Sequence, residues 1–440
     1  MKCGESKENY HLWKMELLFG QLENYLVVER CGGTKSNVYV QLKSRPKMYK
    51  GMTEPRREDK TLIQESLHRE VSFRTCTSRV IGGSSVIALN IDNCNIDNLL
   101  HELELRRFKV LTAGVVTVEV AGNQEGYIAP QFDSFDSTFA MFSLSSRGFK
   151  VTDCLNSSFL KHLATVPDDL LPDVLHALAH AVDQNSLCPL EVALDKSLTD
   201  LSKNKRATEK TSKKKKTGNE LPEHYVSVRR LVLTPTAVVG LPAVPIVENR
   251  VLRQYGADRF LRVALREEDF QKLNSWPFRY KNKQRHIEAI GEVLRNGIVI
   301  ADRRYHFLAC SNSQLREHGL YMYACDGQNT VDTIRSWMGD LTDERCVATY
   351  VSRLGQCFTS TTATLTIEPD SLTMVDDICN DKYCFTDGIG KISESLAKKV
   401  TFNTFNTSHK RMIVMMVVVK CFRFISLEIF VLIFVLIITN

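Results

Sequence analysis

Cysteine pairs with metal-ligand spacing are missing from this sequence: no Cys-x-x-Cys pair occurs among its 13 cysteines. The nearest two, Cys379 and Cys384, have four residues between them, which fits neither a zinc ribbon nor the disulfide framework of a secreted domain. The N-terminus is polar and lacks the apolar segment of a secretory signal. These absences predict an intracellular protein of the cytoplasm or nucleus with free thiols.

Excess positive charge is also absent outside one segment. The formal net charge is +6, and residues 203–216 alone carry eight basic side chains and one glutamate, so the rest of the chain is close to neutral. Residues 201–220 have no apolar periodicity, and their like charges repel one another. We therefore predict a basic flexible linker over 201–220. A nuclear localisation signal is an alternative interpretation of the same residues.

Several motifs of catalytic sites are missing as well. His176 and His180 stand four residues apart on an amphipathic segment that predicts a helix, but the glutamate of an HExxH zinc motif is absent, which favours ordinary helix histidines. No glycine-led P-loop is present. The pairs Asp168–Asp169 and Asp376–Asp377 are adjacent, so in an extended segment their side chains point apart. We assign no metal ligand.

Short strands alternate with brief helices, which predicts an α+β fold rather than a doubly wound sheet. In a mixed N-terminal region, residues 1–200, the pattern predicts strands around 38–42 and 116–120, a helix over 96–108, loops with anchoring aromatics over 121–150, and a helix from about 171. Beyond the linker it predicts strands at 225–234, 260–263, 298–300, 305–310 and 362–368, and helices at 281–296, 330–338 and 343–354.

Residues 337–393 contain the densest motifs, WMGD, RLGQCFTST and FTDGIGKIS. Glycine mixed with hydroxyl and charged side chains is costly in a core unless these groups face a ligand, so this stretch predicts a site. Asp387 and Gly388 form a turn signal, and Gly390 and Lys391 follow, which suits a bound phosphate. An ordinary hairpin turn is the alternative.

Taken together, seven segments in order resemble the eukaryotic cellular RNA-dependent RNA polymerases of RNA silencing. These segments are RRLVLTPT, ENRVLRQY, FLRV, YHFLACSNSQLREHGLYMY, WMGD, RLGQCFTST and FTDGIGKIS. The resemblance covers about residues 225–400. It implies that residues 221–400 form the slab and the first double-psi β-barrel of an incomplete polymerase core. It also implies a nucleotidyltransferase that copies single-stranded RNA from nucleoside triphosphates with Mg²⁺, among the proteins of a small-RNA pathway.

The sequence departs from the family at its metal site, because the family's DxDGD loop does not occur in the chain. We therefore assign no catalytic residue and expect this chain alone to be inactive. A non-catalytic RNA-binding or interaction module is the alternative.

The motifs and the basic residues supply two groups of contact candidates, for which structural ion pairs and caps are the alternative. Candidates for contacts with nucleotide or RNA are Arg353, Gln356, Ser360, Thr361, Asp387, Gly388, Gly390 and Lys391. Candidates for contacts with the RNA backbone are Arg229, Arg230, Lys213, Lys214, Lys215 and Lys216.

Residues 401–440 form an apolar tail without family resemblance. Lys420, Arg423 and Glu428 interrupt the run, whereas a membrane span needs about 20 mostly apolar residues. A C-terminal transmembrane anchor, which would tether the protein to a membrane, competes with a translated intron or frame-shifted end in place of the polymerase C-terminus. We favour the second interpretation.

Overall fold

The computed structural model describes most of the chain. The described residues are 2–3, 10–16, 22–30, 33–53, 68–69, 86–113, 132–152, 154–184, 189–211, 221–222, 224–235, 237–273, 290–361, 369–371, scattered positions between 373 and 399, 414–418 and 431–435.

The chain divides into two compact units that are not successive in sequence. The first comprises residues 1–218, 230–242 and 263–303, and the second comprises 219–229, 243–262 and 304–440. Four of the boundaries fall within strands, so each of four strands contributes residues to both units. The serial division predicted from composition, with domains on either side of residues 201–220, differs from this arrangement, because charge runs do not report strand pairing.

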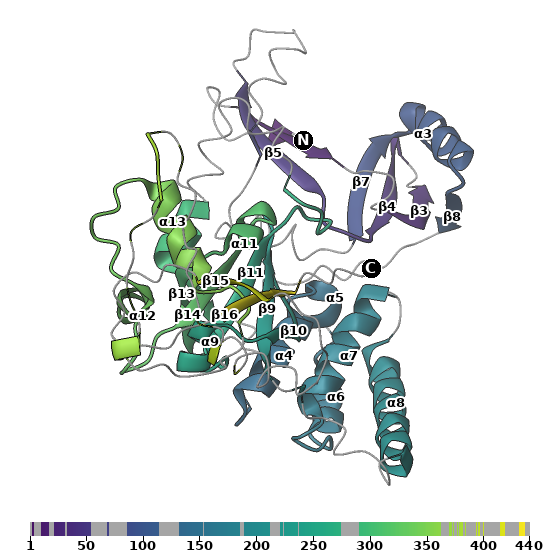
Figure 1. The fold of residues 1–440 in the computed structure, drawn as a ribbon. Helices are drawn as coiled ribbons and strands as arrows, with labels where there is room; N and C mark the ends of the chain where they lie inside the picture. Colours follow the sequence, from purple (N-terminus) through teal and green to yellow (C-terminus); the bar gives the residue numbers. More distant parts are fainter. Residues whose placement is uncertain are drawn as a thin grey trace, which may run out of the picture. The chain divides into compact units, whose positions relative to one another are not determined.

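In the first unit, one sheet has the order β7-β4-β3-β8, where β3 is Leu22–Arg30, β4 Lys35–Leu42, β7 Val86–Asp92 and β8 Lys109–Ala113. Helix α3, Asn93–Leu105, connects β7 to β8 (Figure 1). Alternate residues of β4 are buried, and they share a core with Ile96 and Leu103 of α3. This confirms the strand and helix predicted here. The predicted strand at 116–120 lies outside the described residues.

A second sheet of this unit has the order β1-β2-β5-β6. Its strands are β1 Lys2–Cys3, β2 Tyr10–Glu16, β5 Lys47–Thr53 and β6 His68–Arg69. All three strand pairs are antiparallel.

Helices α4 to α8 complete the first unit. Their bounds are α4 Phe135–Ser145, α5 Phe149–Thr152, α6 Ser157–Leu163, α7 Leu171–Gln184 and α8 Leu190–Thr211. The predicted helix from about 171 is α7, and it packs against α4 and α8 around a common apolar core. Its buried residues follow the helical period, which is why the pattern revealed it.

Two predictions in this unit are wrong. Residues 135–145 form a helix rather than loops, capped by Ser134, whose side chain accepts from the backbone N–H of Asp136 (3.2 Å). Residues 137–141 of this helix are all buried, so no amphipathic period marks it in the sequence. Residues 201–211 are also helical, not a flexible linker, because α8 extends to Thr211. Lysine, arginine, alanine and glutamate are good helix formers, and the buried first turns of α8 nucleate the remainder.

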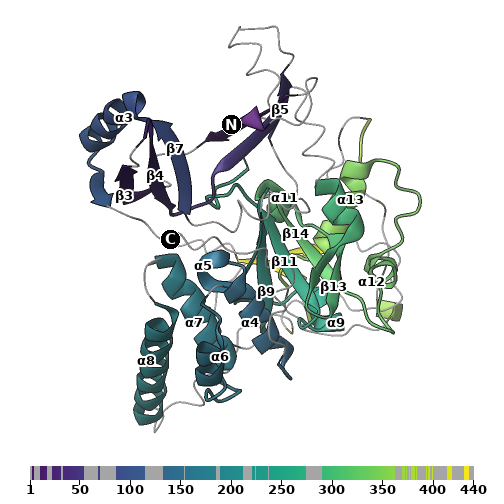
Figure 2. The same ribbon diagram turned by 180° about the vertical axis from the view of Figure 1, so that it is seen from behind.

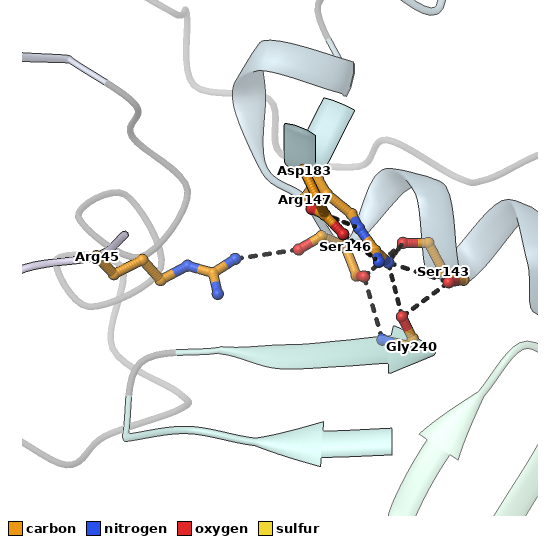
Figure 3. A network of polar contacts seen from close by, with 6 residues as sticks. All are labelled: Arg45, Ser143, Ser146, Arg147, Asp183 and Gly240. Carbon is orange, nitrogen blue, oxygen red and sulfur yellow. Dashed lines mark hydrogen bonds and ion pairs between the residues drawn. The ribbon is translucent and has the colours of Figure 1, made fainter. Parts of the chain in front are cut away.

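A buried polar network ties α4 to the sheet that follows the helices. Arg147, just after α4, donates to the carbonyl oxygens of Ser143 and Gly240 and forms an ion pair with Asp183 of α7 (2.9 Å). The hydroxyl of Ser143 also donates to the Gly240 carbonyl at 2.7 Å. These contacts converge on strand β10, Val238–Val247 (Figure 3).

The largest sheet has six strands in the order β10-β9-β11-β14-β13-β12. Its other strands are β9 Tyr225–Leu233, β11 Phe260–Leu265, β12 Ile298–Ile300, β13 Arg303–Ala309 and β14 Gly319–Ala324. The fold is therefore a mixed α/β fold with a curled sheet. The predicted strands at 225–234 and 260–263 and the predicted hairpin around residue 301 are confirmed, with Ala301 at a positive φ of 52° in the turn.

Four described helices, between and after these strands, belong to the second unit and are seen from both sides in Figures 1 and 2. Their bounds are α9 Arg250–Tyr255, α11 Asn312–Arg316, α12 Val331–Met338, α13 Val347–Gln356 and the 3-10 turn Pro369–Ser371. Helix α12 matches its prediction, and a capping box at Thr330 begins it. Helix α13 begins at Val347, later than predicted. Of the helix predicted at 281–296, residues 290–296 are described and are helical, and Gly297 follows at φ 73°. The strand predicted at 362–368 lies outside the described residues.

In the tail, β15 Val414–Val418 pairs antiparallel with β16 Val431–Val435. None of the described helices combines the length and the apolar character needed to cross a bilayer.

Candidate nucleic-acid interface

Four predicted contact residues lie together at the end of α13, namely Arg353, Gln356, Ser360 and Thr361. Gly355 brings this end of the helix against the backbone that follows β13, because a Cβ at Gly355 would lie 2.6 Å from the carbonyl oxygen of Cys310. Phe358 then anchors the next turn, with its ring stacked on Tyr321 at a centroid distance of 4.4 Å. We call residues 356–361 the 356–361 loop.

The far end of the 356–361 loop is held by residues in and just before α9. Arg253 donates to both the carbonyl oxygen and the hydroxyl oxygen of Thr361, the latter at 2.8 Å, and forms an ion pair with Glu248 at 3.2 Å. The backbone N–H of Thr361 donates to the carbonyl of Glu248 (3.2 Å), and Ser360 forms a β-bridge with Asn249. The loop is therefore fixed at both ends.

The middle of the 356–361 loop faces solvent. Gln356, Thr359 and Ser360 are exposed, whereas Phe358 between them is buried. Arg353 precedes them with its side chain 35% exposed, and its Nε lies 3.8 Å from a carboxylate oxygen of Glu344. Amide, hydroxyl and guanidinium groups are those that hydrogen-bond to phosphate and sugar oxygens of nucleic acids.

The WMGD motif supports this loop from the end of α12. Trp337 meets Tyr255 edge to face at 5.4 Å, and the guanidinium of Arg250 lies 4.5 Å from the centre of the Trp337 ring. The thiol of Cys357 donates to the carbonyl oxygen of Met338 at 3.5 Å. Burial raises the pKa of Tyr255, although Arg250 opposes the shift. The segments ENRVLRQY, WMGD and RLGQCFTST thus meet in one place.

The two arginines of β9 have protein partners. Arg229 is 6% exposed and donates to the backbone carbonyl and the carboxylate of Asp258, the latter at 2.8 Å. Arg230 donates through Nε to the carbonyl of Pro242 at 2.9 Å. Both contacts match the structural alternative of ion pairs and backbone bonds. Alternate strand residues point to opposite faces, and each of these side chains has found a partner on its own face.

The remaining contact candidates lie outside the described residues, namely Asp387, Gly388, Gly390, Lys391 and Lys213, Lys214, Lys215 and Lys216. Their contacts with nucleotide or RNA stay a prediction.

A two-metal centre needs a cluster of carboxylates. In the described part of the chain, no three His, Cys, Asp or Glu side chains are placed to hold a metal ion. The residues present do not fit such a centre, and we derive no chemical step through it.

His176 and His180 lie on α7 in the first unit. Burial, aided by the charge of Arg147, lowers the pKa of His176 to about 4, so its imidazole is neutral at physiological pH.

Sequence reasoning did not identify Arg253, Glu248 and Asn249 as part of this site. They belong to the ENRVLRQY segment, which contributed only to the family resemblance. The sequence signal available here was a helix-capping asparagine with an acidic residue before it and a basic residue after it. In the structure Asn249 caps α9, its side chain accepting from the backbone N–H of Leu252 at 3.0 Å. Such a pattern predicts a helix start but not a partner 108 positions away.

Residues 233–417 match the family model described as RNA dependent RNA polymerase. A probable RNA-dependent RNA polymerase, SHL2, of Oryza sativa subsp. japonica is 38% identical over 199 residues, which cover 41% of this chain and 16% of that protein. Probable RNA-dependent RNA polymerase 2 of the same organism is 25% identical over 346 residues, covering 75% of this chain and 30% of that protein. Residues 1–200 and residues 221–440 each make up about half of the chain. A match that covers 75% of the chain must therefore include residues on both sides of the basic segment, so this similarity extends into the N-terminal half.

Among solved structures, RNA dependent RNA polymerase QDE-1 from Thielavia terrestris covers 45% of this chain and 24% of its own, at 17% identity and a TM-score of 0.35. We draw nothing from so low a TM-score. The similarity to RNA-dependent RNA polymerases therefore rests on the sequence matches, which in the family model cover residues 233–417. The chain spans only 16% of the first rice relative.

Proposed function

We propose that the chain is part of an RNA-directed RNA polymerase, a nucleotidyltransferase that copies single-stranded RNA from nucleoside triphosphates in small-RNA gene silencing. The observation that supports this most is the meeting of three family-matched segments around the 356–361 loop. Two of its exposed side chains, Gln356 and Ser360, are among the predicted contacts. In the intact enzyme the curled sheet would belong to the first double-psi β-barrel.

Within this proposal the 356–361 loop and Arg353 contact RNA backbone or nucleotide phosphate. A guanidinium offers a planar fork to phosphate oxygens, and hydroxyl and amide groups complete the contacts with sugar and phosphate. The exposed fraction of Arg353 allows such a contact, and Glu344 holds its side chain loosely at 3.8 Å. An ion pair this long and partly exposed adds little stability. Breaking the contact with Glu344 when a phosphate binds Arg353 therefore costs little free energy.

Mg²⁺ is expected for the intact enzyme, in which two metal ions would activate the primer hydroxyl and stabilise the leaving pyrophosphate. Octahedral Mg²⁺ needs carboxylate oxygens, and the DxDGD sequence that supplies them in the family is absent from this chain. We propose that this chain by itself binds RNA but does not extend it.

Fluorescence anisotropy with single-stranded RNA, measured over a series of salt concentrations, tests the binding. R353E should weaken binding several-fold and lower the magnitude of the salt slope by about 0.7 for one lost phosphate contact on a single strand. R295E serves as a matched control, since Arg295 is an exposed arginine of the first unit. Equal effects of R353E and R295E would show that the interaction is unspecific charge attraction.

A non-catalytic RNA-binding or interaction module is the second candidate, favoured by the same absence of the DxDGD sequence. Primer extension separates the two. Restored incorporation when a family segment that contains DxDGD is added in trans would support the polymerase. Unaltered RNA binding without incorporation under the same conditions would support the module.

A further inference from the structure

At the Thr361 end of the 356–361 loop, one side chain from outside the loop adds to the backbone contacts that hold it. The guanidinium of Arg253 binds Thr361 twice, through its carbonyl and its hydroxyl oxygen. Thr361 directly follows the exposed Ser360. A contact with Thr361 therefore restrains the backbone from which the Ser360 side chain projects.

Arg253 is itself oriented by its surroundings. Its Nη1 lies 3.2 Å from the carboxylate of Glu248, and that carboxylate also lies 3.4 Å from Nδ1 of His224. Both side chains of the Arg253–Glu248 pair are more than four-fifths buried, at 17% and 15% exposed. Since a largely buried charged pair with several hydrogen bonds has little rotational freedom, Arg253 presents a fixed set of donors to Thr361.

The other end of the loop is anchored independently by the packing of Gly355 on Cys310 and of Phe358 on Tyr321. Between these anchors, the side chains of Gln356, Thr359 and Ser360 point to solvent and contribute nothing to the core. A loop that is rigid in its backbone yet exposed in its polar side chains is preorganised, which lowers the entropy lost on binding.

We infer that Arg253 is a positioning residue for RNA binding, acting through Thr361 on the 356–361 loop with Glu248 as its support. This inference rests on the proposed function, because it assumes that the loop contacts RNA. Arg253 itself touches no phosphate. Its contribution is to hold the loop in the conformation that binds.

The experiment compares the full 440-residue chain with R253M, R253K, E248Q, T361V and R335M. R335M is the matched structural control, since Arg335 is also half-buried and donates to two backbone carbonyls, those of Leu308 at 3.0 Å and Phe307 at 2.8 Å, in the same unit. The readouts are RNA affinity, its salt slope, thermal unfolding, and hydrogen exchange at the Thr361 amide, which is bonded to Glu248.

R253M should weaken RNA binding by about tenfold, the effect of one lost charge-assisted interaction, without changing the salt slope. R253K should recover part of the affinity, and E248Q should weaken it less than R253M. Exchange at the Thr361 amide should accelerate in R253M but not in R335M, even where both variants lower the unfolding temperature equally. The double variant R253M/T361V should be less impaired than the product of the two single effects.

The outcomes separate the two claims. If the unsubstituted chain shows no salt-dependent RNA binding, the proposed function and this inference fail together. If the chain binds RNA and R353E weakens it while R253M and E248Q leave affinity unchanged, only the positioning role is refuted. A lower salt slope in R253M would also overturn it, because that result would make Arg253 a direct phosphate contact.

Discussion

Replacing Arg147 by methionine should lower the free energy of unfolding of the first unit by about 2–3 kcal/mol. The substitution keeps an unbranched apolar stem and removes the buried guanidinium, which is 9% exposed. Its hydrogen bonds to Ser143 and Gly240 and its ion pair with Asp183 would be lost (Figure 3).

The size of this loss in unfolding free energy depends on which contacts the partners of Arg147 keep after the substitution. Removing one member of a fully buried ion pair costs about 3–5 kcal/mol because a buried charge is left uncompensated. Asp183, however, is 41% exposed, so water can solvate it. The carbonyl of Gly240 still accepts from the hydroxyl of Ser143, and the carbonyl of Ser143 still accepts from the hydroxyl of Ser146 at 2.7 Å. The cost therefore falls below the range for an isolated buried pair.

Urea unfolding followed by circular dichroism at 222 nm measures this change, because most of the described helices belong to this unit. D183N should cost less than about 1 kcal/mol, since the exposed end of the pair is screened by solvent. R106M, at an exposed arginine after α3, should stay within about 0.5 kcal/mol of the unsubstituted chain. A loss below about 1 kcal/mol for R147M, or an equal loss for D183N, would refute the reasoning from buried acceptors.

Three further predictions follow from close packing and from perturbed pKa values. G355A should destabilise the second unit by about 1–3 kcal/mol and weaken RNA binding, since its Cβ would collide with the Cys310 carbonyl; thermal unfolding of G355A beside an alanine at exposed Ser336 measures the cost. Burial holds the folded pKa of His176 near 4, below its unfolded value of about 6.5, so stability should fall as pH drops from about 6.5 to 4; a urea midpoint that changes equally with pH in H176Q would contradict this. Hydrogen bonds from Thr349 lower the pKa of the exposed Cys346 thiol, whereas burial raises that of Cys310, so a thiol reagent near neutral pH should label Cys346 first, and mass spectrometry identifies the site.

The elements that the sequence predicted are those whose pattern is local. The period of α7 and the capping box at Thr330 each lie within a few residues of what they determine. Helix α4 escaped prediction because burial on all sides erases the amphipathic period, and the end of α8 escaped because its charges resemble those of a solvated linker. In both segments, tertiary packing stabilises a helix that the local sequence pattern does not indicate.

The candidate site was predictable only in part for a related reason. Gly355 and its polar neighbours stood out because such residues are unusual together, and four predicted contacts do lie at the end of α13. Arg253 did not stand out, since its partner Thr361 is 108 positions away and a single sequence carries no record of such a pair. Arg229 was predicted as an RNA contact on charge alone, and burial gives it Asp258 as its partner instead.

The central claim is that the 356–361 loop and Arg353 form a surface for single-stranded RNA. Its most direct test is the affinity of the 440-residue chain for a labelled single-stranded RNA across a salt series, beside the double variant R353E/S360E. We predict a linear fall of log affinity with log salt for the unsubstituted chain and at least tenfold weaker, flatter binding for the variant. Overlapping curves for the two proteins would contradict the claim.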